Sequence, residues 1–138
     1  MYQKLTIVGN VGRDPEMRYL PDGRAVTSLN VATNRKWTDK ATGEQKEETT
    51  WFRVSVFGPQ AERVNQYVTK GRQVLVEGRL NPDSATGGPR LFTRQDGSVG
   101  AAYEVVADTV RFLGSNVNGH GSNSGTAGQD SDEEEIPF

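Results

Sequence analysis

The sequence predicts an all-β domain, a five-stranded Greek-key barrel with one helix between its third and fourth strands, followed by a disordered acidic tail. Three observations lead to this prediction. Runs of alternating apolar and polar residues recur along the first 113 residues, as expected for strands that bury one face. Only one segment has convincing helical spacing, and it lies in the middle of the chain. Beyond residue 113 the composition changes abruptly to Gly, Ser and Asn.

The first predicted strand covers residues 2–11, where alternation makes Leu5 and Ile7 the expected core pair. The segment Leu-Pro-Asp-Gly at residues 20–23 is a strong turn, because Pro presets φ at its second position and Gly closes it. The first strand is therefore expected to end before this turn.

The second predicted strand is long and covers residues 24–37. Val26 and Leu29 are both apolar but have opposite parity, so a bulge or bend is expected between them. Strong curvature in a long strand suits a small closed barrel. A charged loop at residues 38–48 then leads into the third strand as a hairpin.

The third predicted strand, residues 49–58, has two different faces, because successive side chains of a strand point to opposite sides. One face carries an ordinary core set: Phe52, Val54 and Val56. The other face carries Trp51, Arg53, Ser55 and Phe57. Exposed rings that bracket a guanidinium are typical of a surface on which nucleotide bases stack. The segment alone fits equally well a strand that is buried on both faces.

The single helix is predicted over residues 59–70. Pro59 fits the first helical turn, and Gly71 is a typical stop signal after the last turn. Ala61, Val64 and Val68 recur at helical spacing and are expected to pack on the core.

The rest of the domain returns to strands, the fourth of which covers residues 73–80. Residues 81–90 contain two prolines and two adjacent glycines and must be a loop. Asp96-Gly97 marks a tight hairpin between residues 91–94 and a run that begins near Val99.

The last strand is predicted over residues 102–113, with Val106, Val110 and Phe112 as its inward set. Five strands with a helix between the third and the fourth describe an OB-fold. In that fold the nucleic-acid face lies on the second and third strands and the adjoining loops.

Charge is distributed unevenly along the chain, whose formal net charge is −2. Five of the eighteen acidic residues fall in residues 114–138, which contain no Lys or Arg. The remaining thirteen acids and sixteen bases give residues 1–113 a net charge of +3. A basic body and an acidic tail are therefore separate parts, and the basic body suits a polyanionic ligand.

Several classes of protein are disfavoured by what the sequence lacks. With no cysteine, a disulfide framework or a zinc site of the usual kind is not expected. The only histidine, His120, has no Ser, Cys or carboxylate positioned beside it, so no catalytic residue, metal or cofactor is expected. No secretory, transit or membrane-spanning segment is evident, which predicts a soluble protein of a reducing compartment.

The chain resembles the bacterial single-stranded DNA-binding proteins. The segments that carry the resemblance are Ile7-Val8-Gly9-Asn10-Val11-Gly12-Arg13-Asp14-Pro15-Glu16, Thr49-Thr50-Trp51-Phe52-Arg53-Val54, Phe57-Gly58, Lys70-Gly71, Val76-Glu77-Gly78 and Asp132-Glu133-Glu134-Glu135-Ile136-Pro137-Phe138. The resemblance implies a non-enzymatic homotetramer of OB-folds that coats single-stranded DNA in replication, recombination and repair. It also implies a cytoplasmic, nucleoid-associated protein whose tail recruits replication and repair proteins.

The same resemblance assigns stacking and partner-binding roles to individual residues, and position along the chain suggests the phosphate contacts. Those expected to stack on bases are Trp37, Trp51, Phe57 and Phe92, the last at a place where the family usually has tryptophan. Beside the same strands and loops lie the expected phosphate contacts: Arg35, Lys36, Lys40, Lys46, Arg53, Arg79, Arg90 and Arg94. The expected partner-binding residues are Asp132, Glu133, Glu134, Glu135, Ile136, Pro137 and Phe138.

The expected organisation is a DNA-binding domain at residues 1–113, a flexible linker at residues 114–131 and an interaction tip at residues 132–138. An OB-fold module that binds RNA is the alternative function, although it leaves the acidic Ile-Pro-Phe ending unexplained. A hydrolase that uses the barrel face is a third hypothesis. It would need clustered acids or metal ligands on that face.

Overall fold

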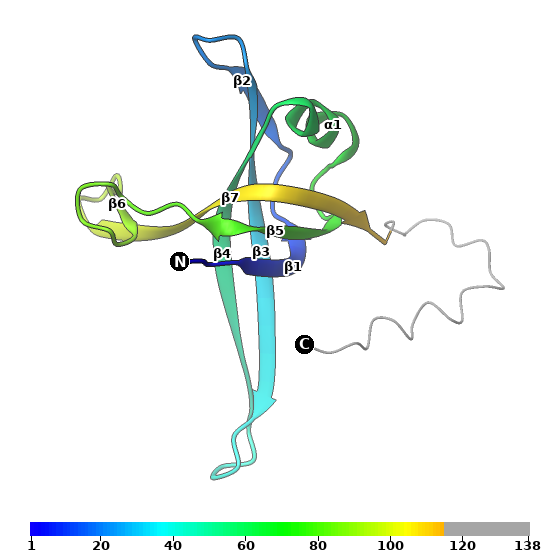
Figure 1. Cartoon of the computed structure of the whole chain (residues 1–138). Helices are drawn as coiled ribbons and strands as arrows, with labels where there is room; N and C mark the ends of the chain where they lie inside the picture. Colours follow the sequence, from blue (N-terminus) through cyan, green and yellow to red (C-terminus); the bar gives the residue numbers. More distant parts are fainter. Residues whose placement is uncertain (115–138) are drawn as a thin grey trace, which may run out of the picture.

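The computed structural model of the chain describes residues 1–114 (Figure 1). The rest of the predicted linker and the whole acidic tip lie outside these residues. The described chain forms β1 (Leu5–Val11), β2 (Glu16–Tyr19), β3 (Ala25–Thr38), β4 (Gln45–Phe57), α1 (Pro59–Tyr67), β5 (Gln73–Leu80), β6 (Arg90–Thr93) and β7 (Val99–Leu113). Among residues 1–114, no helix is long and apolar enough to cross a membrane.

Five of these strands close into a barrel. The sheet runs in the order β1-β5-β7-β4-β3, and β1 pairs again with β3 to close the ring. The closing contact is short, with Asn10 opposite Ala32 and Val11 opposite Val31. Strands β2 and β6 lie outside the ring and pair with β3 and β7 respectively. The predicted OB-fold, with its helix between the third and fourth barrel strands, is confirmed.

The core is made of small aliphatic side chains that point into the barrel, such as Val31, Val54 and Val76, each fully buried. Helix α1 packs against the barrel through Ala61 and Val64 (Figure 1). The helix ends at Tyr67 rather than at the predicted residue 70, because Val68 is already extended. Val68 remains buried in the core all the same.

The hairpin of β3 and β4 is longer than predicted. Its strands reach Thr38 and resume at Gln45, so the predicted charged loop shrinks to a six-residue connection, residues 39–44. Beyond the barrel, residues 33–38 and 45–50 form a two-stranded ribbon, here called the arm, which projects from the body (Figure 1).

A bulge or bend was predicted between Val26 and Leu29, and the bulge is wrong, because the β3–β4 register is unbroken from Val26 to Thr38. Leu29 points into the barrel and Val26 points out. Val26 is nevertheless buried, since its cross-strand partners Arg18 and Phe57 flank it on the outer face. Val26 and Leu29 are therefore both apolar despite their opposite parity because the start of β3 is covered on both faces.

A bulge occurs instead in β7. The β5–β7 register shifts between Glu77 and Gly78, which leaves Asp108 as an extra residue in β7. Val105 and Ala107 are therefore buried before the bulge, whereas Val110 and Phe112 pack against the core after it. The prediction that Val106 points inward is wrong for this reason.

The β7 bulge is held by a side chain of α1. Gln60 Nε2 donates to the Asp108 carbonyl oxygen at 3.2 Å, and Gln60 Oε1 accepts from the Val110 N–H at 2.8 Å. The helix therefore completes the hydrogen bonding that the irregular pairing leaves open.

Candidate nucleic-acid interface

The two faces of β4 differ as the alternation predicts. Val54 and Val56 are fully buried, while Trp51 and Phe57 on the opposite face are 54% and 36% exposed. The alternative, a strand buried on both faces within the chain, is therefore wrong. The two exposed rings are six residues apart, which is roughly 20 Å along an extended strand.

Trp51 rests on the backbone that follows β1. A Cβ atom at Gly12 would lie 2.5 Å from Cζ3 and 2.7 Å from Cη2 of Trp51, so only glycine fits under the indole. The Gly12 N–H donates to the Asn30 carbonyl at 2.8 Å, which ties this segment to β3. The contact fixes one side of the ring and leaves the other to solvent.

The neighbouring residue extends this contact. With the Asn30 amide oriented to satisfy both groups, its side-chain oxygen accepts from Nε and Nη2 of Arg13 at 3.1 and 3.2 Å. Sequence reasoning missed Gly12 and Arg13 as part of the site. Both lie within the first segment that resembles the family, and no pattern in a single sequence ties them to Trp51.

Phe92 lies on the short strand β6, whose four residues are all exposed. Its ring lies over Gly100 on β7, where a Cβ atom would lie 2.7 Å from Cζ of Phe92. A hollow of about 200 Å³ separates this hairpin from the barrel face, and both Trp51 and Phe92 line it. The structure therefore brings these two predicted rings to the same depression.

Tyr103 lines the same hollow and was missed in the sequence analysis. It is 56% exposed, and its ring centroid is 5.9 Å from that of Phe52. The only signal for it was an aromatic residue just inside the last predicted strand.

Arginine side chains lie close to three of the four predicted rings. The guanidinium carbon is 4.4 Å from the ring centroid for Arg35 and Trp37, 5.6 Å for Arg24 and Phe57, and 5.3 Å for Arg94 and Phe92. Such cation–π contacts orient a flexible guanidinium beside a ring. The same group is then placed to meet the phosphate of a base that stacks there. Arg24 was not among the predicted phosphate contacts.

Trp37 lies apart from the other rings. It pairs with Lys46 on the arm, whereas Trp51 pairs with Ala32 at the base of the arm. Trp37 is five residues from Ala32 in an unbroken strand, so it has the opposite parity to Trp51, and the twist of the ribbon adds a rotation between the two rings. The structure does not bring Trp37 and Trp51 into one cluster.

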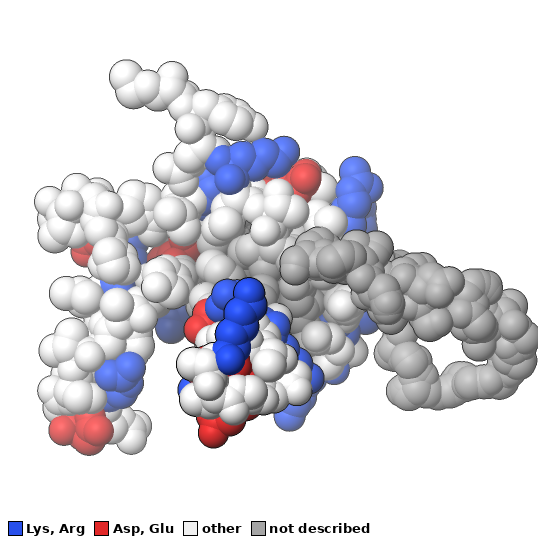
Figure 2. Space-filling view, turned by 90° about the horizontal axis from the view of Figure 1, so that it is seen from below, with Lys and Arg blue, Asp and Glu red and all other residues white. Residues whose placement is uncertain are grey.

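The predicted phosphate contacts fall into three groups. Arg53, Arg90 and Arg94 lie around the hollow and its hairpin. The basic residues of the arm and its tip are Arg35, Lys36, Lys40 and Lys46. Figure 2 views the molecule from below, toward the tip of the arm, and shows basic side chains interspersed with acidic ones. Arg79 forms the third group, as the one predicted phosphate contact on the outer side of β5, which lies across the barrel from β3 and β4.

Arg79 lies in a different depression, a hollow of about 560 Å³ lined by residues 1–4, Arg79 and Asp108. None of the four predicted stacking rings lines it. This hollow is larger than the one beside Trp51, but it lacks the alternation of exposed rings and arginines.

Acidic residues already pair with several of these cations. On the arm, Oε2 of Glu48 lies 3.6 Å from Nη1 of Arg35. Nζ of Lys46 lies 3.9 Å from Oδ2 of Asp39 and 3.7 Å from Oε1 of Glu44. These side chains are largely exposed, and exposed ion pairs are weak. Phosphates can therefore replace the acids at little cost in free energy.

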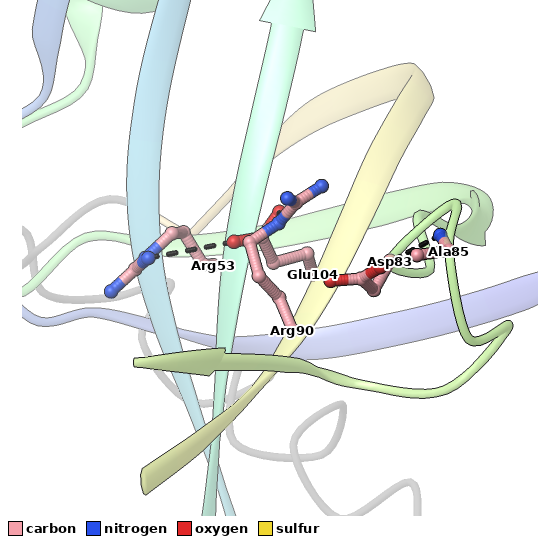
Figure 3. Close-up of polar contacts among 5 residues, drawn as sticks. All are labelled: Arg53, Asp83, Ala85, Arg90 and Glu104. Carbon is pink, nitrogen blue, oxygen red and sulfur yellow. Dashed lines mark hydrogen bonds and ion pairs between the residues drawn. The ribbon is translucent and has the colours of Figure 1, made fainter. Parts of the chain in front are cut away.

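A less exposed cluster of ion pairs lies beside the hollow, where Glu104 meets two arginines (Figure 3). Its Oε2 atom lies 3.5 Å from Nη1 of Arg53, and its Oε1 atom lies 3.1 Å from Nε of Arg90. The Glu104 side chain is only 14% exposed. Sequence analysis did not identify this residue.

Two turns near the interface hold aspartates with lowered pKa values. At the turn before β3, the Arg24 backbone N–H and guanidinium hold the pKa of Asp22 below its usual value. At the tip of the β6–β7 hairpin, hydrogen bonds from the Ser98 hydroxyl and N–H lower the pKa of Asp96. Both carboxylates are thus charged at neutral pH and fix the turns that present Arg24 and Arg94.

Residues 1–114 contain no group of three or more His, Cys, Asp or Glu side chains placed to hold a metal ion.

The family model of the single-strand binding protein family matches residues 2–113 of this chain. Among solved structures, the chain is similar to the Plasmodium falciparum SSB in complex with ssDNA. The two are 27% identical, with a TM-score of 0.66, over 83% of this chain and 97% of that chain. The chain therefore belongs to the single-strand binding protein family.

Proposed function

We propose that this protein binds single-stranded DNA without sequence preference, with no catalytic step, by stacking bases on Trp51, Phe57, Phe92 and Trp37. The observation that carries the proposal is the outer face of β4, where two exposed rings flank Arg53 above a fully buried core. Every base has a face to stack, so rings give affinity without sequence choice, at about 1–3 kcal/mol per base.

The arginines and lysines beside the rings supply the phosphate contacts in this proposal. Neutralising phosphates releases counterions, so binding weakens as salt is added. We expect phosphate contacts from the arginines around the hollow and from the basic residues of the arm, since members of both groups lie next to stacking rings.

We further propose that residues 1–113 act within a homotetramer that protects single strands during replication, recombination and repair. Residues 114–131 then link this domain to the tip at residues 132–138, whose acids and Ile-Pro-Phe ending recruit replication and repair proteins in the cytoplasm, at the nucleoid. Membership of the family supports this part of the proposal. Light scattering with and without oligo-dT measures the assembly.

The stacking assignment is tested with Trp51→Ala, and Tyr67→Ala serves as the matched control. The two rings are equally exposed, 54% and 53%, but Tyr67 lies on α1, away from the proposed face. We expect Trp51→Ala to weaken oligo-dT binding by about tenfold, the value of one stacked base, and Tyr67→Ala to leave it unchanged. Unchanged affinity in Trp51→Ala, with the fold intact by circular dichroism, would contradict the assignment.

The role of the tip is tested by deleting Phe138. We expect the variant to lose capture of replication and repair proteins while oligo-dT affinity is kept, because an apolar wedge with a terminal carboxylate suits a basic-rimmed pocket on a partner. Survival of both activities would mean that the tip is not the recruiting element. Competition between DNA and RNA oligomers of equal length separates this function from RNA binding.

A further inference from the structure

Strand β6, which carries Phe92, has little to hold it in place. It is four residues long, all four of them exposed (Phe92 by 38%), and it pairs only with β7. The loop that precedes it, residues 81–89, is joined to the barrel at its two ends. The ring of Phe92 seats on Gly100 of β7, but it is not part of the barrel core, so core packing does not set its position relative to Trp51.

Glu104 connects this hairpin to the barrel through three contacts. Its carbonyl oxygen accepts from the Asn81 N–H at 2.7 Å, where the loop begins. Its carboxylate accepts from Arg90 Nε at 3.1 Å, where the loop ends, and from Arg53 Nη1 at 3.5 Å, on β4 (Figure 3). One residue thus joins both ends of the loop to the central strand of the interface.

The carboxylate is placed where its charge has a strong effect. At 14% exposure it is shielded from water, while its two arginines are 46% and 50% exposed. An ion pair in such a setting is screened less than one at the surface. The guanidinium carbon of Arg53 in turn lies 6.0 Å from the centroid of the Phe92 ring. The arginine that pairs with Glu104 is therefore also a neighbour of Phe92.

We propose that Glu104 is a positioning residue that holds Phe92 beside Trp51 by clamping Arg90 and Arg53. The inference rests on the proposed function, since its benefit is a stacking ring fixed in place before DNA arrives. It also gives Arg90 a role different from a phosphate contact. A preorganised ring binds a base with less loss of conformational entropy than a mobile one.

The test is a double-mutant cycle between Glu104→Gln and Phe92→Ala, with oligo-dT affinity measured in about 0.5 M salt to screen the freed arginines. We expect Glu104→Gln to weaken binding about threefold or more in the natural background, and to have almost no effect when Phe92 is absent, as for residues that act together. Glu62→Gln, the same change at an exposed position on α1, is the control and should leave both backgrounds unchanged.

Arg90→Ala is the second variant, and it keeps the test valid if Glu104→Gln does not fold. We expect it to show the same dependence on Phe92. A phosphate contact would instead weaken binding equally in both backgrounds and reduce the salt dependence. Equal losses for both variants in the two backgrounds, or no loss at all, would overturn the inference.

A measurement without DNA separates this inference from the proposed function. Hydrogen exchange of the β6 amides should be faster in Glu104→Gln than in the natural protein or in Glu62→Gln. Unchanged exchange would overturn the clamp even if the protein binds DNA. Absence of oligo-dT binding by the natural protein would instead overturn the proposed function.

Discussion

Trp51 and Phe92 both lie over a glycine, yet the two regions that carry them are built differently. Trp51 belongs to β4, which pairs with β3 on one side and β7 on the other and buries Val54 and Val56 completely. Phe92 belongs to an exposed strand with one neighbour. The barrel core thus positions the first ring, whereas polar contacts must position the second. Equal chemistry at a binding face does not imply equal rigidity.

The largest expected effect comes from disturbing the rigid side. Gly12→Ala places a Cβ atom within 2.5–2.7 Å of the Trp51 indole, which must move away from its seat. Gly12 does not have a positive φ, so the ring alone excludes the side chain. We expect oligo-dT affinity to fall about tenfold, as when one stacked base is lost.

Gly88→Ala is the control for this substitution. Gly88 also lacks a positive φ, and its nearest neighbour to an added Cβ is Thr86 Oγ1 at 3.6 Å, an ordinary contact. Tryptophan fluorescence titrations should show no change for Gly88→Ala. Equal affinity of Gly12→Ala and Gly88→Ala would mean that the position of Trp51 does not matter for binding.

Gly100→Ala disturbs the side that polar contacts hold and should have a smaller effect. The added Cβ would meet Phe92 Cζ at 2.7 Å and Arg94 Nη2 at 2.6 Å. The arginine tip can rotate away, and the hairpin can adjust because no core packing holds it. We expect a loss of about threefold, less than the loss of one whole stacked base. A loss as large as that of Gly12→Ala would show that the hairpin is as rigid as the barrel face.

The smallest expected effect concerns the phosphate contacts. Arg53→Ala should reduce the slope of log affinity against log salt by about 0.7, the value for one phosphate of a single strand. Arg79→Ala should keep the slope, because Arg79 lies on the far wall with residues 1–4. Titrations at several salt concentrations measure both. Equal slope changes would mean that the DNA also contacts the wall formed by β5.

The alternation in β4 could be predicted from sequence because both of its determinants are local. Val54 and Val56 mark the core face by composition, and strand geometry then assigns Trp51 and Phe57 to the other side. The order of the five barrel strands and the single helix were predictable for the same reason, whereas β2 was not predicted. Each is written in a continuous run of residues.

Features that depend on pairing were not predictable. The extra residue Asp108 reverses the inward parity of β7, and only the register against β5 reveals it. Glu104 carries no signal in the sequence, because its two arginines come to it from β4 and β6, at residues 53 and 90. Trp37 was grouped with Trp51 by resemblance, whereas the β3–β4 register separates them.

The opposite placement of Trp37 and Trp51 has a consequence for any strand that contacts both. Such a strand must follow the twisted ribbon and turn with it between the two indoles. The two tryptophans then report on separate segments of DNA. An oligomer too short to make the turn quenches the fluorescence of one indole only, so the length at which the second is quenched measures the contour of the path.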